Sequence, residues 1–133
     1  LRVWLDSADG YHGKDELLAI ARRAKARDLS LLVDFHYSDT WADPGHQAKP
    51  AAWEGLDPAE LTRAVYDHTF EVCSRLRAQG TLPTMVQIGN ELNAGMLWPD
   101  GHTYDPASGN AWENQALFDF EGKPLPAISV FQP

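Results

Sequence analysis

Asn90 and Glu91 end a short run of β-forming residues, MVQIGNE at 85–91, and a loop punctuated by glycine and proline follows. A carboxyl group at such a position can donate and accept protons, which is the chemistry of a general acid or base. A glutamate at the end of a buried strand must be paired, protonated or functional, because an uncompensated buried charge is costly. We therefore expect Glu91 to be a proton donor, with surface decoration as the alternative.

Polar side chains also stand near the ends of the other two predicted strands. They are Asp6 after the first strand and, around the end of the second, Asp34, His36, Tyr37 and Asp39. Ligands of parallel sheets bind where the carboxyl ends of the strands meet, so these residues and Glu91 are expected on one side. For His36, a hydrogen-bonded structural role is the alternative to catalysis. A metal site of His36, Asp39 and His46 is disfavoured, because the spacing matches no common ligand pattern.

The predicted elements that position these residues alternate between strand and helix. Strands are predicted over residues 1–5, 31–36 and 85–90, and helices over residues 14–28 and 58–79. This order predicts an α/β fold with parallel strands and crossover helices, both helices lying on the same face of the sheet. The nearly continuous apolar run at 29–37, LSLLVDFHY, predicts a strand that is covered on both faces.

The second helix has the clearest local signals. Asp57 is a good N-cap, Pro58 suits the first helical position, and Glu60 stands where it completes a capping box. Gly80 is expected to end the helix. These signals are independent of the rest of the fold.

Composition narrows the class of protein. A length of 133 residues predicts one domain, and a net charge of −8 argues against binding to nucleic acid. No apolar run approaches the roughly 18 residues of a membrane span, and no signal-peptide pattern opens the chain. The first residues, LRVW, resemble a strand already in progress, so a truncated or processed N-terminus is expected. Five Trp, four Tyr and five Phe beside 19 acidic residues suit a sugar-binding surface, with ordinary core packing as the alternative.

Two long motifs carry a resemblance to a known family. The segments LLVDFHYSDTWADPGHQAKPAAW, residues 31–53, and VQIGNELNAGMLWP, residues 86–99, resemble the endo-β-1,4-galactanases of glycoside hydrolase family 53. The family belongs to the clan of retaining (β/α)₈ barrels. The resemblance implies a partial TIM barrel, with barrel units two to four in residues 1–102, a linker-like junction at 103–110, and a C-terminal barrel segment at 111–133.

The resemblance also implies roles for individual residues. Glu91 matches the general acid/base of the family, Asn90 the partner that orients sugar hydroxyls, and Arg2 an arginine that keeps the nucleophile ionised. Further residues match positions near the substrate cleft: Asp34, His36, Tyr37, Trp41, Asp43 and Trp98. For Trp98, packing within its own loop is the alternative to stacking on a sugar.

The activity implied is endo-acting hydrolysis of β-1,4-galactosidic bonds in galactan or arabinogalactan, by a retaining mechanism that uses two carboxyl groups. The nucleophile of the family ends the seventh barrel strand, and strands one and five to seven are expected to lie outside this chain. Glu113 does not match the nucleophile by context. The alternative function is a catalytically inactive fragment that binds galactan. A mannanase-like or cellulase-like enzyme is disfavoured by the loop DFHYSDTWADP at 34–44.

The resemblance completes the expectations about partners and location. We expect no cofactor and no metal in this chain, although calcium is possible in the full-length family. The expected partner is a galactan-type polysaccharide, with no nucleic acid and no membrane. A monomeric, secreted enzyme of pectin degradation is expected.

Overall fold

The structure is a computed structural model that describes residues 1–7 and 10–102 of the chain. In chain order the elements are β1 (Arg2–Val3), α1 (Lys14–Lys25), β2 (Leu32–Phe35), the 3₁₀ helix η1 (Ala51–Trp53), α2 (Pro58–Ala78) and β3 (Met85–Ile88). The elements are shorter than predicted, and η1 lies in a stretch that was expected to be loop. The predicted junction at 103–110 and the predicted segment at 111–133 lie outside the described residues.

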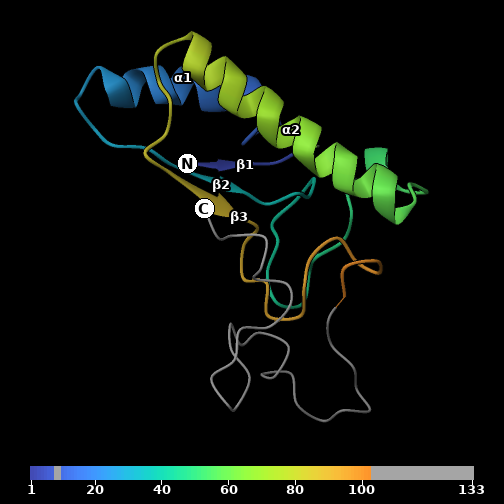
Figure 1. The fold of residues 1–133 in the computed structure, drawn as a ribbon. Coiled ribbons are helices and arrows are strands. Elements are labelled where there is room, and N and C mark those ends of the chain that lie inside the picture. The colour runs from blue at the N-terminus through green and yellow to red at the C-terminus, as the bar shows by residue number, and fades with distance from the viewer. Residues whose placement is uncertain (8–9, 103–133) are drawn as a thin grey trace, which may run out of the picture.

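The three strands form one parallel sheet in the order β1-β2-β3. Asp34 in the central strand pairs with Arg2 on one side and with Gln87 on the other, so these three residues form one row across the sheet. Both helices cover the same face of the sheet, as Figure 1 shows. The predicted parallel α/β arrangement, with both crossover helices on one face, is therefore confirmed.

The start of α2 is stabilised as the sequence predicts. The Asp57 carboxylate accepts hydrogen bonds from the backbone N–H groups of Ala59 and Glu60, each at 2.8 Å. The Glu60 carboxylate accepts in return from the backbone N–H of Asp57 at 3.0 Å, which completes the capping box. Gly80 follows the helix with a φ of 77°, a conformation that favours glycine. Within the described residues, neither helix is long and apolar enough to cross a membrane.

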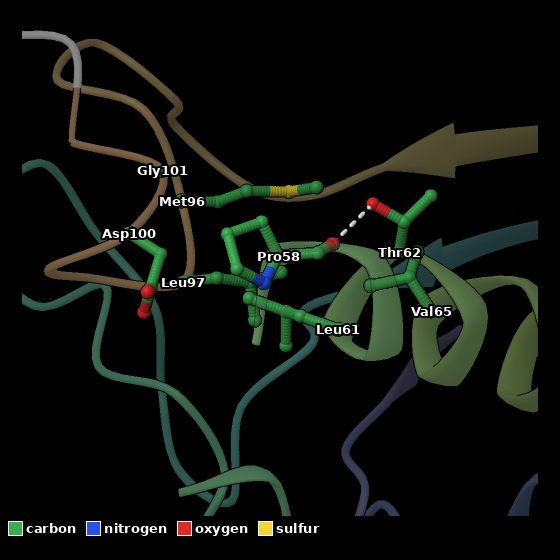
Figure 2. A pocket seen from close by; sticks show the side chains of 8 residues that line it. All are labelled: Pro58, Leu61, Thr62, Val65, Met96, Leu97, Asp100 and Gly101. Atoms are coloured by element: carbon green, nitrogen blue, oxygen red, sulfur yellow. Dashed lines mark hydrogen bonds between the residues drawn. The ribbon is translucent and has the colours of Figure 1, made fainter. Parts of the chain in front are cut away.

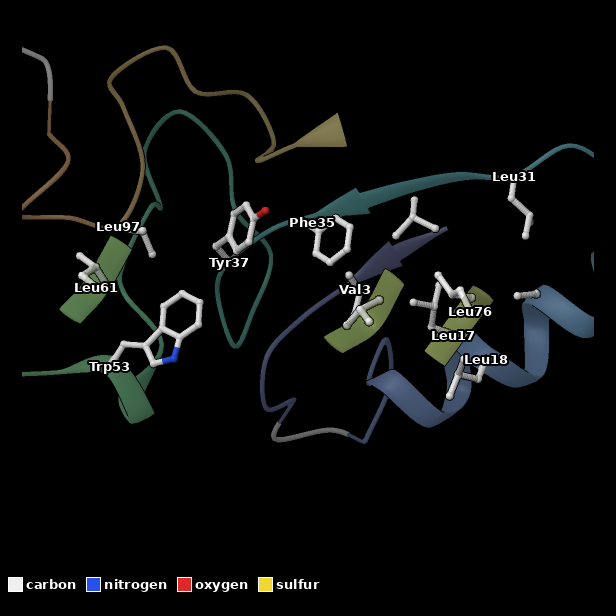
Figure 3. Close-up of a cluster of buried hydrophobic side chains, with 13 residues drawn as sticks. Val3, Leu17, Leu18, Leu31, Phe35, Tyr37, Trp53, Leu61, Leu76 and Leu97 are labelled. Atoms are coloured by element: carbon white, nitrogen blue, oxygen red, sulfur yellow. The ribbon is translucent and has the colours of Figure 1, made fainter. Parts of the chain in front are cut away.

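The hydrophobic core lies between the sheet and the two helices (Figure 3). Val33 and Phe35 project from β2 toward the helices and are completely buried. The helices contribute the buried apolar residues Leu17, Leu18, Ala21, Leu61, Val72 and Leu76. The helical stripes predicted by the 3.6-residue period therefore pack on one face of the sheet.

The opposite face of the sheet corrects one expectation. β2 was predicted to be covered on both faces, but Leu32 on the other face is exposed. β3 is an edge strand within the described residues, and Met85, Val86 and Ile88 are exposed. The apolar run indicates that both faces of β2 favour burial, but it does not show which elements bury the second face.

Candidate active site

His36 and Asp34 lie at the end of β2 and contact each other. Nε2 of His36 lies 3.1 Å from Oδ2 of Asp34, and Nδ1 accepts the backbone N–H of Ala42 at 3.1 Å. Because Nδ1 is an acceptor, the hydrogen of the neutral ring is on Nε2 and is donated to Asp34. Burial lowers the pKa of His36, and the neighbouring Asp34 carboxylate opposes that shift. The ring is therefore a neutral structural group at neutral pH.

The burial of His36 argues against a direct contact between its ring and substrate. Only 1% of His36 is exposed, so its ring is not available as a contact surface for a sugar. Its two ring nitrogens are both occupied by protein groups. His36 instead holds the loop after β2 against the strand end, which is the structural alternative weighed for it.

Ala42 links this cluster to the end of β3. Its carbonyl oxygen accepts a hydrogen bond of 2.8 Å from Nδ2 of Asn90, while its N–H donates to His36. The loops that follow β2 and β3 run side by side in Figure 1. His36 and Asn90 therefore lie at the same end of the sheet, as predicted.

Trp41 offers the largest aromatic surface near this cluster. The guanidinium carbon of Arg2 lies 4.3 Å from the centroid of the Trp41 ring, and the His36 ring approaches its edge with a centroid separation of 5.5 Å. Trp41 is still 46% exposed. Arg2 therefore orients the indole through a cation–π contact, and part of the ring remains open to solvent.

Tyr37 lies in the hydrophobic core. Its ring stacks on Phe35 with a centroid distance of 5.7 Å, and its hydroxyl lies 2.8 Å from Oγ1 of Thr69 in α2. Figure 3 shows the ring within the hydrophobic core, on the helix side of the sheet. The burial of Tyr37 therefore argues against a direct contact with substrate. Tyr37 lies two residues beyond β2 and has a φ of 52°, so the alternation of side chains along the strand does not by itself place it there.

Asp43 shapes the loop after β2. Its Oδ1 accepts hydrogen bonds from the backbone N–H of Gly45 and from Nδ1 of His46, both at 2.8 Å. These bonds, that of Gly45 first, hold the pKa of Asp43 below its usual value. Asp39 ties the same loop down by accepting from the backbone N–H groups of Asp6 and Ala51. Among residues 1–7 and 10–102, no cluster of three His, Cys, Asp or Glu side chains can hold a metal ion.

Glu91 is exposed in the described structure, which corrects the expectation of a buried strand end. The reason is that β3 is the edge of the three-stranded sheet, so no described strand covers its outer side. The backbone at Glu91 adopts a φ of 50°, in the left-handed region. Its carbonyl oxygen accepts the N–H of Asn93 at 2.8 Å, which closes a tight turn. A positive φ at a non-glycine residue costs free energy and persists only where the surrounding contacts hold it.

Trp98 is held by its own loop. Its indole Nε1 donates to the carbonyl oxygen of Ala94 at 2.9 Å, and its ring meets the edge of His102 with a centroid distance of 4.7 Å. The ring is only partly buried, so the packing observed here leaves some of its surface open.

Gln47 is a buried residue that the sequence did not single out. Its side-chain Nε2 donates to the carbonyl oxygen of Asn90 at 2.7 Å, across 43 residues of chain. Its backbone carbonyl accepts the N–H of Trp98, also at 2.7 Å. A glutamine in a polar loop carries no local signal of such contacts, because its partners are distant in sequence.

An apolar pocket of about 330 Å³ lies beside the site but not in it. Figure 2 shows it between the first turns of α2 and the loop after β3, with Leu61 facing Met96 and Leu97. Lys49 and Asp100 form an ion pair of 2.6 Å nearby. None of the residues predicted to act in catalysis or substrate binding lines this pocket.

Comparisons with known proteins agree with the motifs. The chain is 50% identical over 102 residues to an arabinogalactan endo-β-1,4-galactanase of Thermothelomyces thermophilus, covering 77% of this chain and 30% of that protein. The corresponding enzyme of Humicola insolens is 44% identical over 115 residues, covering 86% of this chain and 32% of that protein. The chain thus spans about a third of the length of these relatives.

Solved structures show the same relationship. A structure from a study of two fungal β-1,4-galactanases superposes with a TM-score of 0.74 and 47% identity, covering 85% of this chain and 32% of that one. The family 53 catalytic domain of Ignisphaera aggregans gives a TM-score of 0.72 and 41% identity, covering 86% and 33%. The described residues therefore have the fold of part of a (β/α)₈ barrel. The model of glycosyl hydrolase family 53 matches residues 1–107, and the chain belongs to this family.

Proposed function

We propose that this chain supplies the acid/base side of the active site of an endo-acting β-1,4-galactanase. The observation that carries the proposal is the position of Glu91, three residues after the end of β3, on the side where the loop after β2 meets the loop after β3. Its sequence context is that of proteins named arabinogalactan endo-β-1,4-galactanases, to which the chain is up to 50% identical. The proposed reaction is hydrolysis of the β-1,4 bonds of galactan with retention of configuration.

Glu91 has two successive tasks in this mechanism. Its protonated carboxyl first gives a proton to the oxygen of the leaving sugar, while a second carboxylate attacks the anomeric carbon and forms a covalent glycosyl intermediate. The Glu91 carboxylate then takes a proton from water, which attacks the same carbon and releases the product. The two carboxyl groups must be about 5–5.5 Å apart. We assign the nucleophile to no residue of this chain.

The remaining predicted residues either contact the sugar or fix the loops around it. The partly open face of Trp41 suits the CH face of a galactose ring, and Arg2 fixes the angle of that indole. Asp34 and Asn90 offer polar atoms at the same end of the sheet. Asp43 and Trp98 act from the two neighbouring loops. Because polymeric galactan does not enter a cell intact, we propose that the enzyme is secreted.

The release of reducing ends from β-1,4-galactan tests the proposal. The protein is expressed from the complete reading frame that contains this sequence, as the unchanged enzyme and as Glu91→Gln. The unchanged enzyme is expected to hydrolyse galactan, and Glu91→Gln to lose several powers of ten in rate, because an amide cannot donate the proton. Glu54→Gln, at an exposed glutamate in the loop after β2, is the control and should keep full activity. An inactive unchanged enzyme, or an active Glu91→Gln variant, contradicts the proposal.

The isolated 133-residue chain is expected to hydrolyse galactan negligibly. Without an assigned nucleophile, neither water nor Asn90 can form the covalent intermediate. The exposed part of Trp41 favours weak binding of galactan as the second candidate function of this chain alone. Retardation of the chain in a galactan-containing native gel, abolished in Trp41→Ala, distinguishes binding from no interaction.

A further inference from the structure

The side chain of Gln47 is buried where the loops after β2 and β3 meet. It is 2% exposed, although both loops lie at the surface. Its Nε2 lies 2.7 Å from the carbonyl oxygen of Asn90, 3.1 Å from that of Asp43 and 3.4 Å from that of Glu91. The two hydrogens of Nε2 serve the two shorter contacts, and the oxygen of Glu91 completes a group of three carbonyls around one amide.

These contacts act on the peptide that leads into Glu91. The Asn90 carbonyl belongs to the peptide bond between Asn90 and Glu91, so a hydrogen bond to it fixes the plane of that peptide. Glu91 has a φ of 50°, which costs free energy for a residue with a Cβ and persists only when its surroundings hold it. The N–H of Asn93 binds the Glu91 carbonyl from the other side. The direction of the Glu91 side chain depends on this peptide.

The main chain of Gln47 binds the same loop a second time. Its carbonyl oxygen accepts the N–H of Trp98 at 2.7 Å. The side chain and the main chain of one residue therefore hold the loop after β3 at two points, before and after Glu91. Asn90 contributes a third tie, from its own side chain to the carbonyl oxygen of Ala42.

We propose that Gln47 is a positioning residue for Glu91: its buried side-chain amide sets the left-handed backbone conformation that directs the catalytic carboxyl at the leaving-group oxygen. The inference rests on the proposed role of Glu91 as general acid. Gln47 does not contact the substrate in this account. A displacement of about 1 Å at a reacting group lowers the rate by up to about 100-fold, which sets the size of the expected effect.

The test compares two substrates that differ in their need for a proton. The leaving group from galactan is a sugar, whose poorly stabilised alkoxide needs a proton from the general acid. The leaving group from a 2,4-dinitrophenyl β-1,4-galactobioside is a stable phenolate, which needs none. kcat/KM is measured for both substrates with the protein from the complete reading frame, because it reports the step that forms the glycosyl intermediate. Gln47→Met keeps the length of the side chain and removes its N–H donors.

A positioning role predicts a selective loss. Gln47→Met should lower kcat/KM for galactan by about 10- to 100-fold and change kcat/KM for the aryl glycoside by less than about 3-fold. Glu91→Gln should show the same selectivity with a larger loss on galactan. A purely structural role lowers both values by the same factor, because only the fraction of folded enzyme changes, and that result overturns the proposal. If Gln47→Met does not fold, Gln47→Asn replaces it, because its shorter side chain keeps the N–H donor but cannot reach Asn90. The same ratio of kcat/KM for galactan to kcat/KM for the aryl glycoside then decides.

The same data separate this inference from the proposed function. An unchanged enzyme that does not cleave galactan, or a Glu91→Gln variant without selective loss, contradicts the role of Glu91 itself. A selective loss in Glu91→Gln together with an equal loss on both substrates in Gln47→Met contradicts only the role of Gln47. Ala48→Gly, at the exposed neighbouring residue, serves as the control for changes in the loop backbone.

Discussion

His36 and Asn90 bind the same residue, Ala42, from opposite sides of its main chain. The Ala42 N–H donates to Nδ1 of His36 at 3.1 Å, and the Ala42 carbonyl accepts from Nδ2 of Asn90 at 2.8 Å. The ends of β2 and β3 are therefore coupled through one buried peptide segment of the intervening loop. A substitution at His36 is therefore expected to displace Asn90, the residue before Glu91.

Replacement of His36 tests this coupling. His36→Phe keeps a ring but leaves the Ala42 N–H without its acceptor and Asp34 without its donor, which is expected to cost about 1–3 kcal/mol of unfolding free energy. In a protein of the relatives' length, about three times the matched 102 residues, each kcal/mol lowers Tm by less than the about 2–4 °C of a 150–250-residue domain. Thermal unfolding of the full-length protein gives the value. His46→Gln, whose side chain is 78% exposed, should stay within about 0.5 kcal/mol, and equal losses in both variants would argue against a special role for His36.

His68 predicts a dependence of stability on pH. It is buried in α2 among the rings of Phe35, Tyr37 and Trp53, and its Nε2 has no hydrogen-bond partner within the described residues. Burial, assisted by the positive charge of Lys14, lowers the pKa of His68 to about 4. The folded protein therefore keeps this ring neutral at a pH where the unfolded chain protonates it.

The expected direction follows from proton uptake. Between the unfolded pKa of 6.5 and the folded pKa of about 4, the unfolded state binds more protons. The contribution of His68 to the free energy of unfolding should therefore fall as the pH is lowered through this window, by up to about 3 kcal/mol, and stay level below it. Denaturant unfolding at several pH values measures this slope. His68→Phe should reduce this slope and His46→Gln should not. An unchanged slope in His68→Phe would show that folding does not lower the pKa of His68.

Tyr37 and Thr69 provide a third prediction, at the interface between the sheet and α2. The Thr69 hydroxyl donates to the carbonyl oxygen of Val65, so Tyr37 is the donor in the 2.8 Å contact between the two side chains. Tyr37→Phe should cost about 0.5–1.5 kcal/mol of unfolding free energy, with KM for galactan unchanged because the ring faces the core. Thr69→Val and the double variant complete a double-mutant cycle. A rise in KM for galactan without a loss of stability would instead indicate that Tyr37 contacts the substrate.

The features that the sequence predicted correctly are those with local causes. The capping box of Asp57 and Glu60 and the apolar stripes of both helices involve residues within a few positions of each other, and the structure has them. The parallel order follows from the alternation of strands and helices. The motif also singles out the strand end at Asn90 and Glu91, whose catalytic role stays a prediction.

The features that sequence reasoning missed depend on contacts between distant segments. Glu91 is exposed because no described strand covers the outer side of β3, which the composition of β3 itself does not reveal. The role of Gln47 depends on Asn90, 43 residues away. Tyr37 stands in a motif that resembles the family's cleft, and its place in the core depends on its contact with Thr69, 32 residues away in α2.

A pair of glycines separates backbone strain from steric conflict near Glu91. Gly89 and Gly55 both have positive φ, 70° and 81°. A Cβ at Gly89 would lie 2.5 Å from the side chain of Leu92, whereas one at Gly55 meets nothing within 4 Å. Gly55→Ala should cost about 1–2 kcal/mol of unfolding free energy from backbone strain alone. Gly89→Ala should cost more and also lower kcat, because Leu92 must move beside Glu91; equal effects of the two variants in thermal unfolding and galactan assays would contradict this.

The assignment of Glu91 as acid/base is tested most directly by chemical rescue. Glu91→Ala removes both the proton donor and the base that activates water, so the glycosyl intermediate forms readily only from an activated substrate and then accumulates. Azide is a small anion that attacks this intermediate without a base. With 2,4-dinitrophenyl β-1,4-galactobioside, azide should raise the turnover of full-length Glu91→Ala and give a β-glycosyl azide. An α-glycosyl azide would identify Glu91 as the nucleophile, and turnover unchanged by azide would contradict its role as acid/base.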